Sequence, residues 1–267
     1  MNIASTLRRF TLLAALLPLL VSCSKEDDII IPGTEVVSGQ YIESVQPGPV
    51  LNRGAANDPL YWVRLLVQNI QPTTNFYNTQ ADSVTWAGQQ GAIAYYCSTD
   101  CSGMLTKLLK QSYGYTSAYF KTWTGTTNPY ASTYYNEIVK RDHFTRISAI
   151  SQIAAGDIIA MKYPSGSTNT GHIMIADGPA VLRTATAPLI TGTVQYEIPV
   201  NDCSSSGHGS LDTRYNGGNW DDGVGRGIFR IYADSRGNMV GYTWSTFSNS
   251  VYYSQSQRQL AVGRHIP

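Results

Sequence analysis

A cysteine at the expected start of a helix is the first feature of this chain that could do chemistry. Cys101 follows Asp100 and precedes the segment 102–111, in which apolar residues recur at helical spacing. A thiol at a helix N-terminus lies in the positive end of the backbone dipole, which lowers its pKa and favours the nucleophilic thiolate. The free N–H groups of that turn could stabilise an oxyanion, and the small Ser102 would let a substrate carbonyl approach. Taken alone, the segment is equally consistent with a buried structural cysteine.

A histidine at the start of an apolar strand could act as the general base. His172 opens the run 172–176 directly after Gly171, and this run follows Gly156-Asp157, a strand-like segment and a polar loop. A lone histidine at a strand edge is usually structural. Here its position after a Gly-Asp strand start and a loop is the one that a general base for Cys101 would take.

The segments around the cysteine and the histidine together resemble the NlpC family of cell-wall peptidases, relatives of the CHAP amidases. No single segment is specific, but their order and spacing form a strong signal over roughly residues 75 to 235. The resemblance implies an α+β, papain-like core in which the helix headed by the catalytic cysteine packs on an antiparallel β-sheet carrying the histidine. It also implies amide cleavage through a thioacyl-enzyme, without a metal or organic cofactor. The resemblance rests on Asp100-Cys101-Ser102-Gly103, Gly156-Asp157 and Gly171-His172-Ile173.

Two residues are candidates for orienting the imidazole. If strand 172–177 pairs antiparallel with strand 197–202 in the register that puts His172 opposite Asp202, the carboxylate can accept the second N–H of the ring. A slip of one residue would turn Asp202 away, and an aspartate that caps the following loop is an equally good interpretation. His208 is the second candidate.

Other residues are candidates for contacting the substrate. The family often has a tyrosine near the oxyanion, and Tyr77, Tyr95 and Tyr96 all lie upstream of the cysteine. The loop 204–214 is expected beside the cleft, where His208 could contact the substrate and Arg214 could hold a carboxylate. A solvated surface loop is the simpler alternative for this segment.

The elements that must position these residues follow from periodicity and turn signals. The apolar run 60–67 fits either a strand or a short helix. Helices are expected at 102–111 and 130–141, and strands at 158–162, 172–176, 193–201 and 227–232, with a last piece at 239–244 that could close the sheet.

The N-terminus predicts export as a bacterial lipoprotein. Arg8 and Arg9 precede the apolar run 10–21, which is too short to span a membrane and has the length of a signal-peptide core. The run ends at Ser22-Cys23, which resembles a lipobox; an ordinary secretory signal is the alternative. Residues 1–22 are then the signal peptide, 23–55 the lipidated N-terminus and tether, and 56–267 the hydrolase domain. Lipid on Cys23 would hold that domain at the cell envelope, on the periplasmic or the surface side of the outer membrane.

Three cysteines remain after lipidation, in an oxidising compartment. If Cys101 stays free as the nucleophile, Cys97 and Cys203 are left as a pair. A disulfide between them would join the nucleophile loop to the strand of Asp202. Two free thiols are the equal alternative.

The composition limits the classes of partner that are expected. The formal charge is +1 and 14% of residues are charged, so no basic excess points to nucleic acid, and no Cys/His spacing resembles a zinc site. The family implies peptidoglycan stem peptides as substrate, typically at a bond next to D-glutamate and diaminopimelate. A catalytically inactive envelope binding protein and a thiol acyltransferase are the alternatives. The oligomeric state stays open.

Overall fold

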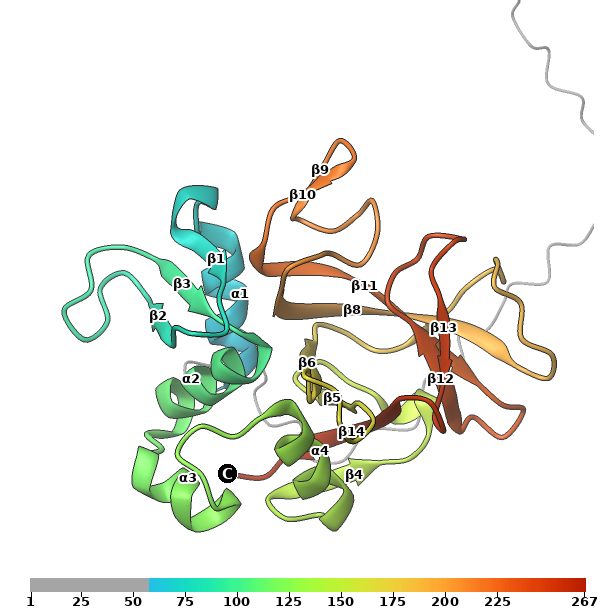
Figure 1. Ribbon diagram of the computed structural model, residues 1–267, viewed down its shortest axis with the longest axis horizontal. Helices are drawn as coiled ribbons and strands as arrows, with labels where there is room; N and C mark the ends of the chain where they lie inside the picture. Colours follow the sequence, from blue (N-terminus) through green and yellow to red (C-terminus); the bar gives the residue numbers. More distant parts are fainter. Residues whose placement is uncertain (1–57) are drawn as a thin grey trace, which may run out of the picture. The chain divides into compact units, whose positions relative to one another are not determined.

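The structure is a computed structural model that describes residues 58–267 (Figure 1). The expected signal peptide, the lipidation site Cys23 and the tether 23–55 lie outside the described residues. Within 58–267, no helix is long and apolar enough to cross a membrane.

Four α-helices precede most of the strands in the described part of the chain. The first one is capped by Asp58, whose carboxylate accepts the Leu60 N–H at 2.8 Å. The second begins at Cys101 and ends where Gly114 adopts a left-handed conformation. The helices are α1 (Pro59–Asn69), α2 (Cys101–Tyr113), α3 (Ser117–Thr124) and α4 (Ala131–Lys140).

A nine-stranded antiparallel sheet dominates the described residues (Figure 1). Its strands are ordered β13-β12-β11-β8-β6-β5-β14-β4, and β7 pairs with β8 beside this path. Along the chain they are β4 (Phe144–Ile147), β5 (Ile158–Lys162), β6 (Gly171–Ala176), β7 (Val181–Leu182), β8 (Val194–Ser204), β11 (Gly223–Ala233), β12 (Met239–Thr243), β13 (Tyr252–Ser254) and β14 (Gln259–His265).

Two small sheets stand apart from the large one. Strand β3 lies between β1 and β2 and leads directly into α2, while β9 and β10 form a short hairpin. The bounds are β1 (Asn75–Tyr77), β2 (Ser83–Thr85), β3 (Tyr96–Thr99), β9 (Tyr215–Asn216) and β10 (Asn219–Trp220).

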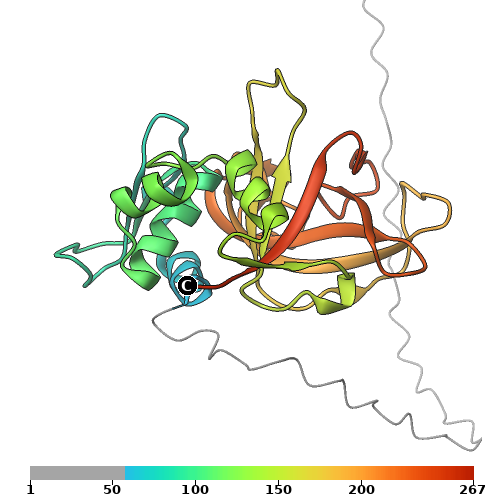
Figure 2. The same ribbon diagram turned by 90° about the horizontal axis from the view of Figure 1, so that it is seen from below.

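Strands β5 and β6 are buried on both faces, because each face packs against a separate apolar core. Ile158 and Ile173 join the core formed with α1, α2 and α4, whereas Ile159 and Met174 join a second core formed with β8, β11 and β14. The alternation follows from the two-residue period of a strand. Figure 2 shows the helices grouped at one side of the large sheet.

The expected α+β, papain-like core with a catalytic helix on an antiparallel sheet is wrong. The described residues are mostly β, with 23% in helices and 33% in strands, and the sheet has nine strands. Polar and glycine-rich stretches caused much of the error. Strand β8 continues to Ser204 and β11 starts at Gly223, although both stretches resemble loops in sequence, because the two strands pair with each other over their whole length.

The expected closing piece of the sheet is also corrected. The segment 239–244 forms β12, which lies between β11 and β13. Strand β14, which the sequence interpretation missed, occupies the position between β5 and β4. Its neighbours are more than 90 residues away along the chain, so no local signal indicates the pairing.

Candidate active site

The short sequence from Asp100 to Gly103 builds the helix end that carries the thiol. The Asp100 carboxylate caps α2 by accepting the Gly103 N–H at 2.7 Å and the Ser102 hydroxyl at 2.9 Å. A Cβ on Gly103 would collide with the Thr99 hydroxyl, so glycine lets the first turn pack against the end of β3. Cys101 is therefore held in the first turn of α2, with 5% of its surface exposed.

The electrostatic setting of Cys101 differs from the sequence expectation. Burial, followed by the negative charge of Asp100, raises the pKa of the thiol to about 12. The backbone N–H groups of Ile173 and Ser102 face the sulfur and act in the opposite direction. The desolvation cost of a full charge exceeds the stabilisation by the partial charges of a helix end, so the prediction of a lowered pKa is wrong.

The candidate base lies at the start of β6. Gly171 has a φ of +148°, and a Cβ there would collide with the Met161 carbonyl oxygen, so the close approach of β5 to β6 requires glycine. Nε2 of His172 lies 2.7 Å from Oδ2 of Asp202. Nε2 is thereby engaged, which leaves Nδ1 as the ring nitrogen available to take a proton.

The structure brings Asp202 to His172 in a different register from the expected one. Ile175 pairs with Asn201, whereas the expected register pairs Ile175 with the residue two positions before Asn201. A shift by two keeps Asp202 on the same face of the sheet as His172, and the side chain reaches the ring diagonally. Asp202, not His208, is thus the residue bound to His172.

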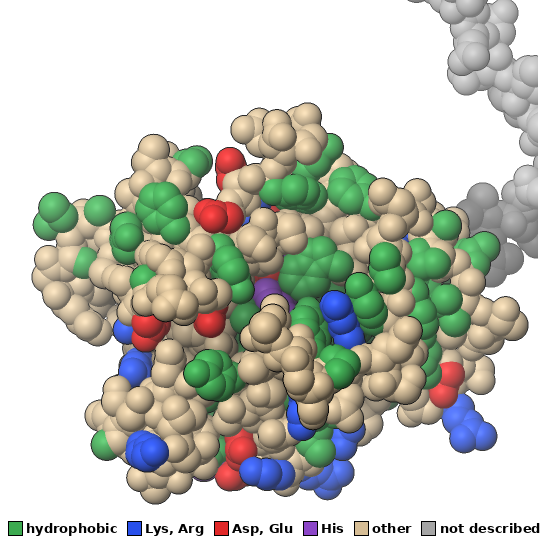
Figure 3. Space-filling model, viewed as in Figure 1, with side chains coloured by type: hydrophobic (Ala, Val, Ile, Leu, Met, Phe, Trp, Pro, Cys, Tyr) green, Lys and Arg blue, Asp and Glu red, His purple; other side chains and the backbone are tan. Residues whose placement is uncertain are grey.

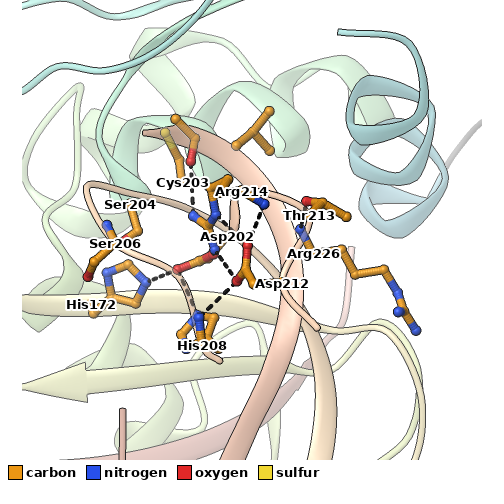
Figure 4. Close-up of polar contacts among 12 residues, drawn as sticks. His172, Asp202, Cys203, Ser204, Ser206, His208, Asp212, Thr213, Arg214 and Arg226 are labelled. Carbon is orange, nitrogen blue, oxygen red and sulfur yellow. Dashed lines mark hydrogen bonds and ion pairs between the residues drawn. The ribbon is translucent and has the colours of Figure 1, made fainter. Parts of the chain in front are cut away.

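A buried network supports the Asp202 carboxylate from its other sides (Figure 4). His208 Nε2 lies 3.1 Å from the oxygen that also contacts His172, and Arg214 donates to the second oxygen at 2.7 Å. Arg214 also donates to Asp212 through two nitrogens, each at 2.9 Å. Burial raises the pKa of Asp202, but the positive charge of Arg214 and the neighbouring His208 and His172 hold it well below its usual range.

This network changes the roles expected for two residues. The side chains of His208 and Arg214 are 0% and 2% exposed, and their polar atoms are used within the protein. His208 Nδ1 lies 2.7 Å from the Trp244 carbonyl oxygen and its Nε2 lies 3.1 Å from Asp202, so both ring nitrogens are engaged within the protein. The positions of His208 and Arg214 therefore do not support the predicted substrate contacts.

The surroundings of His172 favour the neutral form of its imidazole. Burial is the largest cause that lowers its pKa, and the neighbouring His208 and Arg214 lower it further, against the effect of Asp202. Trp244 packs its ring against His172 at 4.7 Å between centroids. Sequence reasoning missed Trp244, because nothing in a hydrophobic piece near residue 240 indicates contact with a residue on β6.

A pocket of about 240 Å³ opens beside the thiol. Cys101 and Ser102 line one part of it, and residues 168–171 line another, together with Tyr77 and Tyr130. Seven of the eleven lining residues carry a hydroxyl or amide group. Figure 3 shows a hollow on this face of the molecule with a histidine side chain at its bottom.

One of the three candidate tyrosines reaches the pocket. Tyr77 lines it, and burial, followed by repulsion from an ionised Cys101, raises the pKa of the Tyr77 hydroxyl. Tyr96 lies in β3 with its ring 6.2 Å from that of Phe76 and does not line the pocket, and Tyr95 packs against the helical core. Tyr96 as a substrate contact is therefore not supported by its position.

Cys97 and Cys203 lie side by side as free thiols. Their sulfurs are 3.9 Å apart, and both side chains are fully buried. A disulfide needs about 2.05 Å between the sulfurs, so the expected bond stays a prediction while its two residues are in contact. Within residues 58–267, no group of three or more His, Cys, Asp or Glu side chains could hold a metal ion.

Comparison with known proteins identifies a viral relative. No family model matches the chain, and no solved structure matches it. "Uncharacterized protein R653" of Acanthamoeba polyphaga mimivirus is 31% identical over 216 residues, which cover 77% of this chain and 95% of the viral protein. The alignment therefore spans nearly all of the relative, and the chain belongs to the same protein family as R653.

Proposed function

We propose that this protein is a cysteine hydrolase that cleaves an amide bond, with Cys101 as nucleophile, His172 as general base and Asp202 as the residue that orients the imidazole. One observation carries the proposal. His172 is bound through Nε2 to a buried, ionised carboxylate at 2.7 Å, and the backbone N–H of the next residue, Ile173, faces the Cys101 sulfur. A nucleophile, a base and an orienting acid in this relation are the parts that acyl transfer requires.

The protonation states favour attack with simultaneous proton transfer. The raised pKa of Cys101 and the lowered pKa of His172 both favour a neutral pair at pH 7. His172 Nδ1 then takes the thiol proton as the sulfur bonds to the substrate carbonyl carbon. The carbonyl π electrons move to the oxygen, and the oxyanion forms near the N–H groups of the first turn of α2 and the Tyr77 hydroxyl.

Collapse of the oxyanion completes acylation. The C–N bond breaks, and the leaving nitrogen takes the proton from His172, which leaves a thioester on Cys101. In the second half, His172 takes a proton from water, whose oxygen attacks the thioester. The C–S bond breaks, the free acid leaves, and the thiolate recovers its proton from His172.

The pocket favours a peptide over an acyl chain. Its hydroxyl and amide lining offers hydrogen bonds, whereas a lipid chain needs an apolar channel. On this basis, and on the resemblance of the catalytic segments, we propose peptidoglycan stem peptides as the substrate, and lipid attachment at Cys23 as the link to the envelope. A Cys23→Ser variant that stays in the membrane fraction would contradict the second part.

The decisive experiment uses the full-length protein with purified peptidoglycan and defined stem peptides. Mass spectrometry follows new amines and cleaved fragments for the wild type, Cys101→Ala and His172→Ala, with His143→Ala as a control on a more exposed histidine. We expect cleavage that is lost in the first two variants and kept in the control. Cleavage that survives in Cys101→Ala would refute the mechanism. No cleavage of any substrate, together with a thiol inert to iodoacetamide at every pH, would favour a binding protein.

A further inference from the structure

Arg258 is a half-buried cation without an acidic partner in the described part of the chain. Its guanidinium carbon lies 4.2 Å from the ring centroid of Tyr163 and 3.8 Å from that of Tyr253. No carboxylate within residues 58–267 forms an ion pair with it. The two rings fix the plane of the guanidinium, so its donors are held in place before any ligand arrives.

Backbone pairing places Arg258 near the candidate site. Gln259 pairs with Lys162, so Arg258 stands next to Tyr163 across the strands, and the Tyr163 N–H donates to the Thr170 carbonyl at 3.1 Å. Thr170 lines the pocket of the thiol. Since neighbouring strands lie about 4.8 Å apart, the Arg258 backbone is roughly 10 Å from that of Thr170.

The side chains concerned share one face of the sheet. His172 is two residues from Met174 along β6, so both point to the side of the second core, and Tyr163 and Tyr253 pack against that core. Both Arg258 and Cys101 affect the pKa of the Tyr163 hydroxyl. Burial is the largest cause and raises this pKa, Arg258 lowers it, and Cys101 raises it further.

We propose that Arg258, held against Tyr163 and Tyr253, binds a carboxylate of the substrate within about three residues of the scissile amide. The inference rests on the proposed function and names a feature of its substrate. The planar fork of a guanidinium matches the two oxygens of a carboxylate. Arg214, which the sequence suggested for this task, already donates to Asp202, Asp212 and the Gly223 carbonyl.

A binding experiment separates this inference from the proposed hydrolysis. Full-length Cys101→Ala protein, which cannot turn substrate over, is titrated with N-acetylglutamate, N-acetylglutamine and inorganic phosphate, and the arginine side-chain N–H resonances are followed by NMR. The titration is repeated with Arg258→Gln and Arg258→Lys added, and with Arg236→Gln, which removes a charge from an exposed turn. Thermal melting checks that each variant is folded.

We expect N-acetylglutamate to bind at least about tenfold more tightly than the neutral amide, and Arg258→Gln to abolish that preference while Arg236→Gln keeps it. Arg258→Lys should retain less than half of the preference, since it keeps the charge without the fork. Equal binding of acid and amide, or an unchanged preference in folded Arg258→Gln, overturns the proposal. A response to phosphate as strong as that to the carboxylate overturns the assignment of a peptide ligand. Carboxylate preference without any hydrolysis supports the subsite and counts against the proposed enzyme alone.

Discussion

Cys101 and Asp202 are both almost completely buried, yet burial has opposite outcomes for their charge. Around Asp202, Arg214 donates to one carboxylate oxygen and the Nε2 atoms of His172 and His208 contact the other, and the pKa of the carboxyl lies well below its usual range. Around Cys101, the backbone N–H groups of Ile173 and Ser102 face the sulfur with partial charges, while Asp100 and Asp202 repel a thiolate, and the pKa of the thiol rises to about 12. The desolvation penalty thus decides the state of a group only where no charged partner offsets it.

This difference implies a division of labour across the site. The network around Asp202 keeps this carboxylate ionised, and the carboxylate fixes the tautomer and orientation of His172. The α2 side holds a neutral thiol that gains charge only during attack. The following experiments test each side, beginning with the largest expected effect.

Asp202→Asn removes the charge and keeps the shape. An asparagine can present its amide nitrogen to His172 and stabilise the wrong tautomer, so we expect kcat to fall by about 10³–10⁴-fold. Steady-state kinetics on the substrate identified above measure the loss. A loss under tenfold would mean that Asp202 acts only in folding. Asp221→Asn, on the loop before β11, is the matched control and should keep full activity.

Alkylation of Cys101 tests the neutral thiol directly. With a pKa of about 12 only roughly 10⁻⁵ of the thiol is ionised at pH 7, so the iodoacetamide rate should rise about tenfold per pH unit, or a thousandfold from pH 7 to 10. Peptide mass spectrometry follows Cys101 separately from Cys97 and Cys203. A rate that is fast and flat between pH 6 and 9 would show a preformed thiolate–imidazolium pair instead.

Asp100→Asn sharpens the same experiment. Asparagine also caps helices, so α2 is kept while one negative charge next to the thiol is lost. Since Asp100 raises the pKa of Cys101, its removal should lower that pKa and speed alkylation at pH 7 several-fold. An unchanged rate would leave burial and the charge of Asp202 as the causes of the raised pKa.

Arg214→Met tests the buried network. The variant leaves Asp202 and Asp212 without their cation, which should lower the free energy of unfolding by about 3–5 kcal/mol. Urea denaturation measures the change, with the exposed Arg236→Met as control within about 0.5 kcal/mol of the wild type. A small loss for Arg214→Met would mean that the two aspartates become protonated when the arginine is absent.

Tyr77→Phe tests the tyrosine hydroxyl in the pocket. It removes one hydroxyl from the pocket and leaves the ring, so we expect kcat to fall about tenfold with little change in KM if the hydroxyl contacts the oxyanion. Tyr96→Phe is the control, because Tyr96 lies outside the pocket lining. Equal rates for Tyr77→Phe and the wild type would remove Tyr77 from the mechanism.

Much of the candidate active site could be predicted from the sequence, because the sequence signals that define it are local. The capping residue Asp100, the small residues after Cys101 and the apolar period of α2 all act within one or two turns, and Gly171-His172 directly precedes an apolar run. These features predicted the helix, strand β6 and the two central residues. The parity of β8 was enough to place Asp202 on the face of His172, even with the register displaced by two residues.

Only the tertiary structure decided the rest. The nine-stranded sheet depends on pairings such as that of β14 with β5, whose hydrogen bonds join segments that carry no mutual signal in the sequence. The same holds for Arg214 and His208, which resemble loop residues until folding removes them from water and places them on Asp202. The raised pKa of Cys101 also depends on the tertiary structure, because desolvation is set by everything that packs around the sulfur. The opposing effect of the helix N-terminus depends only on the first turn of the helix.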